Sequence, residues 1–160
     1  MQPLITLVGA LVVALAAVVG VFLLGIRARW PPVVDAIRGL NRRFLNPIQM
    51  ATAGQRDALA QILRHTGRSS GRTYETPLGI EPTEDSFVIA LVYGNDMAWL
   101  RNVFASGQAE VVRDDVTYPV HRPESVPVAD VIDDFKPSDR RLFRLFGVDT
   151  CLRLYHSKHD

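Results

Sequence analysis

The first hydrophobic segment of the chain is continuous rather than periodic. From Leu4 to Ile26 no side chain carries a charge, and at roughly 1.5 Å per residue a helix of this run would be about 35 Å long. That is enough to cross the hydrocarbon layer of a membrane with some tilt. A cleaved signal peptide is disfavoured because no basic residue precedes the run, and a buried core helix because so long an all-apolar helix is rare in a small domain. We expect residues 1–30 to form a retained transmembrane anchor.

The pattern becomes helical after the Pro31-Pro32 pair. Apolar side chains recur at helical spacing at four positions, Val33, Ile37, Leu40 and Phe44. This spacing predicts an amphipathic helix that ends at Asn46-Pro47. The pattern does not decide whether this helix lies on the membrane surface or packs on the domain. With a loop over residues 51–57, it forms a linker segment over residues 31–57.

Residues 58–160 contain short extended runs with helices between them. We expect strands over residues 59–66, 73–80, 87–93, 109–112, 116–120 and 150–155. We expect helices over residues 96–106, 128–135 and 138–146, the first with Asp96 as N-cap and Gly107 as its stop. Residues 58–63 taken alone would also suit a helix. The fold class predicted is α+β, a small twisted β-barrel with helices around it.

Charge is balanced along the chain as a whole but not beside the apolar run. The chain has 18 basic and 17 acidic side chains, which gives no reason to expect a nucleic-acid partner. Five arginines follow the run closely, Arg27, Arg29, Arg38, Arg42 and Arg43. Because basic residues are retained on the cytoplasmic side, we expect a single-pass protein of the cell membrane with its N-terminus outside and its domain in the cytoplasm.

The segment from His65 to Arg72 is the first candidate binding site. Gly67 and Gly71 allow a tight backbone turn, while Arg68 and Arg72 supply permanent positive charge beside two serines. Such a turn can form a cradle for an anion such as phosphate. A solvated hairpin turn with two unrelated arginines is the alternative that the residues alone leave open.

The segment from Tyr93 to Asn102 is the second candidate. It follows a buried strand and opens a helix, so polar groups there could meet a ligand at the helix N-terminus. Trp99 offers a flat apolar surface, and Arg101 and Asn102 are polar. Each residue taken singly is also consistent with an ordinary structural role, with Trp99 in the core and Arg101 in solvent.

Other reactive side chains do not form a recognisable site. His156 and His159 lie in a charged tail that is more typical of a frayed terminus than of a metal site, and no metal is expected. His65 has no identifiable carboxylate partner, and Cys151 lies in an apolar run typical of a core. The sequence contains no convincing acid–base set. This favours chemistry in which a bound cofactor supplies the reactivity and the protein binds and orients it.

Taken together, the two segments resemble the deazaflavin (coenzyme F420)-dependent nitroreductase family. The resemblance rests on His65 to Arg72, Thr76 to Leu78 and Tyr93 to Asn102 at their spacing, with Asn46-Pro47 upstream, and covers roughly residues 40–155. It implies a split β-barrel related to FMN-binding, pyridoxamine-phosphate-oxidase-like domains over residues 58–160. It also implies coenzyme F420 as the redox cofactor, with FMN as the alternative. A haem-binding or FMN-binding relative on the same barrel also stays open.

The resemblance carries over to individual residues. The family's site consists of a basic turn that holds the cofactor's phosphate and tail, strands that lie along the cofactor, and a helix that closes the site. The residues of this chain that match those parts are Thr66, Gly67, Arg68, Ser69, Ser70, Arg72, Thr76, Pro77, Leu78, Ala90, Leu91, Val92, Tyr93, Gly94, Trp99, Arg101 and Asn102. Ser69 departs from the family, whose members often carry a basic residue there. The proton donor is unknown, with Tyr74, Tyr93 and Tyr155 as candidates.

The resemblance and the anchor together suggest a function. We expect an F420-dependent oxidoreductase that passes a hydride from the reduced cofactor to an apolar, membrane-associated acceptor such as a quinone. Reduction of a lipid double bond and non-catalytic binding of deazaflavin at the membrane are the alternatives. The expected partners are this small apolar acceptor and membrane lipid, and homo-oligomerisation stays open.

Overall fold

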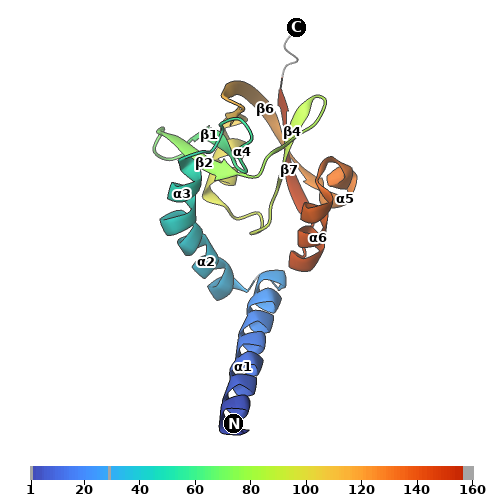
Figure 1. Cartoon of the computed structure of the whole chain (residues 1–160). Coiled ribbons are helices and arrows are strands. Elements are labelled where there is room, and N and C mark those ends of the chain that lie inside the picture. Colours follow the sequence, from blue (N-terminus) through green and yellow to red (C-terminus); the bar gives the residue numbers. More distant parts are fainter. Residues whose placement is uncertain (1, 29, 157–160) are drawn as a thin grey trace.

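The structure is a long N-terminal helix joined to a curled antiparallel sheet (Figure 1). The computed structural model describes residues 2–28 and 30–156, with side chains from Thr6 onward. Arg29 and His159, on which two of the sequence arguments drew, lie outside the described residues. The fold class is the α+β split β-barrel expected, because the sheet curls into a half-barrel with helices around it.

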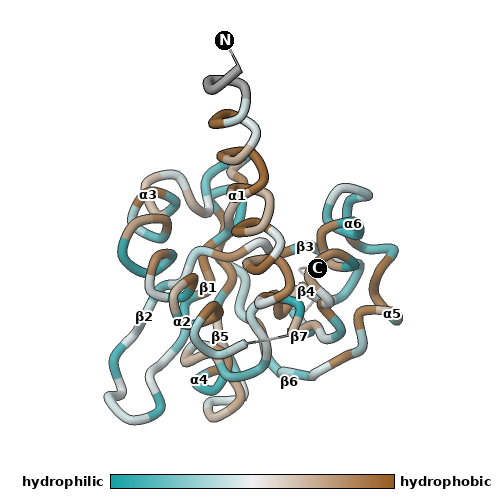
Figure 2. The backbone as a smooth tube through the Cα atoms, turned by 90° about the horizontal axis from the view of Figure 1, so that it is seen from below, coloured by the Kyte–Doolittle hydropathy of each residue, from teal (hydrophilic) through white to brown (hydrophobic). Residues whose placement is uncertain are grey.

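Helix α1 (Gln2–Arg27) is long and apolar enough to cross a membrane by length and composition. Its mean hydropathy over the most apolar stretch is 3.0, and none of that stretch is buried in the fold. Figure 2 shows that it projects from the domain, with α2 (Pro31–Leu40) on one side and α6 (Pro137–Phe146) on the other. The exposed surface of α1 rules out the core helix considered above.

The amphipathic helix is longer than expected. Helix α2 continues through a π-helical turn η1 (Asn41–Leu45) into α3 (Asn46–Met50). The expectation that it ends at Asn46-Pro47 was wrong because the wider turn accommodates Pro47, which lacks a backbone N–H and would break a regular helix. In the wide turn, the Asn46 N–H donates to the Asn41 carbonyl five residues back. We call α2, η1 and α3 together the arm.

Seven antiparallel strands form the sheet in the order β2-β1-β5-β6-β7-β4-β3. Their bounds are β1 (Gln61–Thr66), β2 (Thr73–Leu78), β3 (Glu81–Pro82), β4 (Ser86–Ala90), β5 (Gln108–Arg113), β6 (Val116–Pro127) and β7 (Thr150–His156). The expected strand at 87–93 stops at Ala90, and the helical alternative at 58–63 was wrong. Strand β6 pairs with β5 along its first half, and its pairing with β7 contains a register shift between His121 and Glu124, which bends the sheet.

Local chemistry explains the turns of the barrel. Asp114 and Asp115 both have positive φ (52° and 64°), the conformation that a tight β5–β6 hairpin requires. Helix α4 (Ala98–Ser106) ends at Gly107 in the left-handed conformation, as expected. Its N-cap is Met97 rather than Asp96, because the Asp96 carboxylate pairs with Arg101 instead.

Two hydrophobic clusters lie on the sheet. One, including Leu63, Val111 and Leu152, is covered by α4. The other, including Val88 and Cys151, lies under α5 (Val128–Val131), the 3₁₀ turn η2 (Ile132–Asp134) and α6. Burial raises the pKa of the Cys151 thiol to about 12, in line with the core position expected.

Candidate functional site

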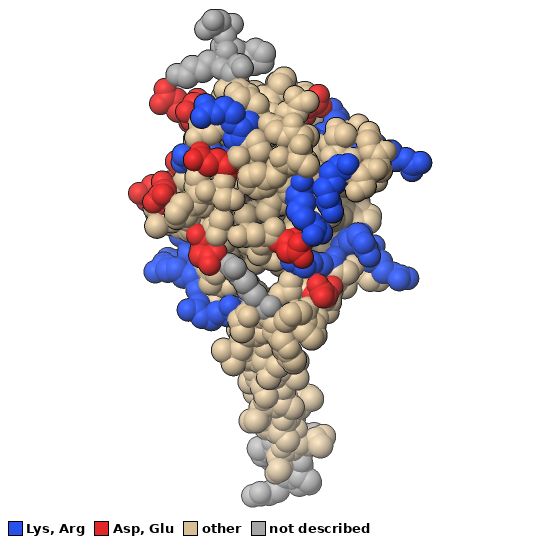
Figure 3. All heavy atoms as spheres, turned by 180° about the vertical axis from the view of Figure 1, so that it is seen from behind, with Lys and Arg blue, Asp and Glu red and all other residues tan. Residues whose placement is uncertain are grey.

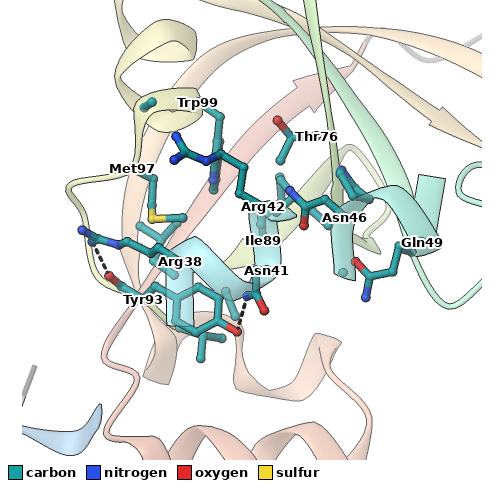
Figure 4. Close-up of a pocket in the computed structure, with 18 of the residues that line it drawn as sticks. Arg38, Asn41, Arg42, Asn46, Gln49, Thr76, Ile89, Tyr93, Met97 and Trp99 are labelled. Carbon is teal, nitrogen blue, oxygen red and sulfur yellow. Dashed lines mark hydrogen bonds between the residues drawn. The ribbon is translucent and has the colours of Figure 1, made fainter. Parts of the chain in front are cut away.

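A cavity of about 1310 Å³ lies between the arm and the barrel. Figure 4 shows arm side chains such as Arg42, Asn46 and Gln49 together with Thr76, Ile89 and Trp99 of the barrel, all of which line the cavity. Residues near the start of α6, including Phe135 and Lys136, also line the cavity. Pockets for drug-sized ligands are roughly 300–1,000 Å³, so this one has room for a large ligand.

The turn between β1 and β2 forms one end of the cavity. The Gly67 N–H donates to the Arg72 carbonyl at 2.8 Å and closes the loop, while Gly71 adopts a left-handed φ of 65°. A Cβ at Gly67 would lie 2.5 Å from both Ser70 Oγ and a ring carbon of Tyr74, so a larger residue there would displace these two side chains. The Tyr74 hydroxyl lies 3.1 Å from Ser70 Oγ. Gly67, Ser70 and Tyr74 all line the cavity.

Asn102 connects this turn to α4. Its Oδ1 accepts hydrogen bonds from the Arg68 backbone N–H at 3.2 Å and from Arg68 Nη1 at 3.1 Å. Because Oδ1 is held by these donors, the Asn102 amide NH₂ donates to His65 Nδ1 at 3.3 Å. His65 therefore carries its proton on Nε2, which lies 3.3 Å from Thr76 Oγ1 and donates to it. Asn102 thus holds the guanidinium of Arg68 at the cavity.

His65 is 5% exposed, and burial lowers its pKa below the ordinary value of 6.5. The hydrogen bonds favour the same state, because a protonated Nδ1 would face the donor group of Asn102. His65 is therefore a neutral connector between Asn102 and Thr76. Sequence reasoning found no carboxylate partner for it, and the partners here are an amide and a hydroxyl.

The end of β4 and the start of α4 form the apolar wall. Gly94 has a φ of 81°, and its N–H donates to the Leu91 carbonyl in a turn that follows β4. Leu91 and Trp99 are buried, belong to the larger core cluster and also line the cavity. The wall is therefore part of the packed core and keeps its shape without a ligand.

The arm contributes a polar wall that sequence reasoning missed. Arg38 Nη2 donates to the Tyr93 carbonyl at 2.8 Å, and Asn41 Nδ2 donates to the Tyr93 hydroxyl at 3.0 Å, both drawn in Figure 4. Arg42, Asn46 and Gln49 follow along the same face. The sequence does show polar residues between the apolar positions of this helix. It could not specify that these polar residues line a cavity.

Most of the predicted binding residues do line one cavity. Those brought together are Gly67, Arg68, Ser69, Ser70, Thr76, Pro77, Leu78, Ala90, Leu91, Val92, Tyr93, Gly94, Trp99 and Asn102. Thr66, Arg72 and Arg101 are not among the lining residues. Arg72 is exposed, and Arg101 pairs with Asp96 at 2.8 Å on the surface.

The three candidate tyrosines differ in whether they line the cavity. Tyr74 and Tyr93 line the cavity. Tyr155 does not, since its hydroxyl donates to Glu124 at 2.9 Å and its ring lies under Arg122. In the described part of the chain, no group of three or more His, Cys, Asp or Glu is placed to hold a metal ion.

The residues present fit a cofactor with a flat ring and an anionic tail. Among the described residues, the cavity-lining cations Arg42, Arg68 and Lys136 have no carboxylate partner within ion-pair distance. Two buried donors on lining residues, Arg38 Nε and Trp99 Nε1, have no hydrogen-bond partner within the described chain. Cations, unused donors and apolar walls in one cavity suit a deazaflavin or flavin.

Comparison with known proteins finds similar folds at low identity. No family model matches the chain, and no curated protein matches it. A solved F420-H2 dependent reductase (FDR-A) is 15% identical with a TM-score of 0.47, covering 60% of this chain and 93% of its own. HutZ, a heme storage protein from Vibrio cholerae, is 10% identical with a TM-score of 0.49, covering 64% and 84%. An FMN-binding protein from Syntrophomonas wolfei is 12% identical with a TM-score of 0.41, covering 78% and 92%. At these values the likeness concerns the fold alone, and function rests on the site.

Proposed function

We propose that this chain is a membrane-anchored oxidoreductase that uses reduced coenzyme F420 to reduce an apolar acceptor of the quinone class. One observation carries the proposal: the two sequence segments that resemble the deazaflavin family, around Arg68 and around Trp99, line the same cavity. When bound, the reduced deazaflavin supplies a hydride. The cavity residues would bind and orient it, and the apolar wall would pack against its ring.

The binding roles follow from the geometry of the turn. Arg68, held by Asn102, and the hydroxyls of Ser69 and Ser70 would hold the phosphate. Arg42 and Lys136, which have no carboxylate partner in the described chain, would meet the acidic tail. Leu91 and Trp99 would form the surface for the ring. We exclude Arg72 and Arg101 from this set because neither lines the cavity.

The acceptor side needs a proton source. Reduction of a quinone to a quinol takes up one hydride and one proton, so a donor must lie near the acceptor. The Tyr93 hydroxyl accepts a hydrogen bond from Asn41, which leaves its own proton free to be donated within the cavity. Tyr74 is the second candidate, although its hydroxyl is already bonded to Ser70.

The membrane location is supported by α1 and its flanks. A span through Thr6–Arg27 followed by Arg38, Arg42 and Arg43 would place the N-terminus outside and the domain in the cytoplasm. An acceptor dissolved in lipid would then be close to the domain. Homo-oligomerisation stays a prediction, which sedimentation of the detergent-solubilised protein would test.

Cofactor binding is the first experiment. Full-length protein in detergent is titrated with F420, FMN and haem, and the same titration is repeated with Arg68→Ala and with Arg72→Ala. We expect F420 to bind, and Arg68→Ala to weaken binding by about 10- to 100-fold, the cost of one or two charge-assisted hydrogen bonds. Arg72→Ala is the matched control and should change affinity little. Preference for FMN or haem, or equal losses in both variants, would contradict the cofactor assignment.

Turnover is the second experiment. Protein loaded with reduced F420 is mixed with a menaquinone analogue, and oxidation of the cofactor is followed by absorbance. Quinol formation supports the proposal. Activity only on an unsaturated lipid would favour the double-bond reductase, and tight binding without turnover on a broad acceptor panel would favour a non-catalytic carrier.

A further inference from the structure

The arm exposes its apolar face to the outside of the molecule. Its cavity face is formed by residues such as Asn41 and Gln49, whereas Leu40, Phe44 and Ile48 are 53%, 53% and 69% exposed. An amphipathic helix that merely packs on its domain would bury this stripe. Here polar residues of the arm line the cavity, Val34 near the start of the arm is buried, and the apolar side chains from Leu40 onward are left largely exposed.

Helix α6, on the other side of α1, also exposes apolar side chains. Its Phe143 is buried in the core cluster, while Leu142 and Leu145 are 47% and 49% exposed. Arg141 and Arg144 of the same helix are also exposed. Two separate helices therefore present leucine or phenylalanine beside arginine to the exterior.

Both helices are attached to the end of α1 that enters the domain. Arg27 Nη1 donates to the Arg144 carbonyl at 2.9 Å, which ties the end of α6 to α1. A Cβ at Gly25 would lie 2.8 Å from Val33 Cγ2, so the start of α2 packs closely on α1. In Figure 3, Lys and Arg side chains gather on both sides of the point where the stalk meets the domain.

We propose that these two helices dock on a lipid surface with anionic headgroups. The docking surface consists of Leu40, Phe44, Leu142 and Leu145, which would enter the headgroup region, and of Arg43, Arg141 and Arg144, which would contact the phosphates. Apolar residues beside basic ones are the composition that binds an anionic membrane interface. The exposed apolar surface of α1 is continuous and ends where the two helices are attached, which favours lipid as the occupant.

A second copy of the chain fits this surface less well. In a symmetric dimer the same patch is used by both subunits, so the arginines of one copy would face those of the other. Headgroup phosphates carry the complementary charge. The cavity lies between the arm and α6, so docking would hold its lining close to the bilayer. The inference rests on the membrane location proposed above, but it needs neither the cofactor nor the acceptor.

The test places a probe on each part of the surface. Full-length Phe44→Cys, Leu145→Cys and, as control, Val116→Cys are labelled with an environment-sensitive dye and reconstituted into vesicles containing phosphatidylglycerol. The native Cys151 is buried and does not compete for the label. Val116 is exposed on the β5–β6 hairpin, which is hydrogen-bonded to the loop at Gly54 rather than to α1. We expect brominated lipids to quench the dyes at positions 44 and 145 several-fold more than at 116.

Charge is tested with a matched pair. Arg144→Glu should lower quenching at position 145 in phosphatidylglycerol vesicles. Arg56→Glu, which reverses the charge of an exposed residue in the 51–57 loop, should leave that quenching unchanged. Without the charge reversal, quenching of the dyes at positions 44 and 145 should also fall in vesicles of phosphatidylcholine alone. Equal quenching at 44, 145 and 116 would overturn the proposal. So would energy transfer between labels at position 44 of two copies without lipid quenching, which would assign the surface to a dimer.

Discussion

The two walls of the cavity are built in different ways. The barrel wall is continuous with the hydrophobic core, since Leu91 and Trp99 belong to the main cluster, and its turn is fixed by Asn102. The arm wall is bonded to the barrel through polar contacts of Arg38 and Asn41 with Tyr93, and it leaves Phe44 and Ile48 exposed. A wall held by a few hydrogen bonds opens at lower free-energy cost than one built into the core. We therefore expect the barrel wall to fix the cofactor site and the arm to adjust to the ligand and the membrane.

The largest difference between the two walls should be in stability. Leu152→Ala removes a side chain buried at 0% exposure in the main cluster and should lower the free energy of unfolding by about 2–5 kcal/mol. Phe44→Ala on the outer face of the arm should change it by less than about 0.5 kcal/mol. Denaturant unfolding in detergent measures both. A comparable loss for Phe44→Ala would mean that the arm is packed against a partner in solution.

Removal of Asn102 should be the next largest effect. Asn102→Ala leaves the Arg68 N–H without its acceptor and frees the guanidinium, so F420 affinity should fall by about 10- to 100-fold. Asn46 is a cavity residue of the arm, and Asn46→Ala should weaken F420 binding less than Asn102→Ala. Titration with F420 compares the two. If Asn46→Ala has the stronger effect, the arm rather than the barrel fixes the cofactor.

The pH dependence of stability should originate on the barrel wall. Burial lowers the folded-state pKa of His65, so below the unfolded value of about 6.5 the unfolded chain binds a proton that the folded chain does not. Stability should therefore fall as pH falls from about 6.5 towards the lower folded-state pKa. Unfolding curves between these limits, measured for wild type and His65→Gln, test this. A variant with the same slope as wild type would assign the effect to another group.

Loosening the arm should have a smaller and local effect. Asn41→Ala removes the hydrogen bond to the Tyr93 hydroxyl, a contribution of about 0.5–1.5 kcal/mol. Hydrogen exchange should become faster in residues 31–50 while β1 and β7 keep their protection. Uniformly faster exchange would show that the arm and the barrel unfold as one unit.

The smallest effect is expected at Arg101. Its ion pair with Asp96 is solvent-exposed, with side chains 50% and 74% accessible, so Arg101→Ala should change stability by less than about 0.5 kcal/mol. F420 affinity should also stay within error, because Arg101 does not line the cavity. A clear loss of binding would restore Arg101 to the site that the family resemblance implied.

The barrel wall could largely be read from the sequence. Glycines beside arginines and serines predicted the turn at 67–72, and an unbroken β-branched run predicted the buried strand that becomes β4. These are local signals, because the residues that favour a turn or a buried strand lie within a few positions of one another in the sequence. The resemblance to a family then placed both segments at one site, and the structure brings most of the predicted residues to one cavity.

The sequence by itself determined the apolar length of α1, most strands and helices of the barrel and the residue types of the turn at residues 67–72. Tertiary structure alone decided that Arg68 lines the cavity while Arg72 does not, and that Tyr155 lies away from it. It also decided that the arm turns its polar side inward. The physical reason is that an amphipathic pattern states which residues share a helix face, whereas what each face meets depends on contacts between segments far apart in the chain.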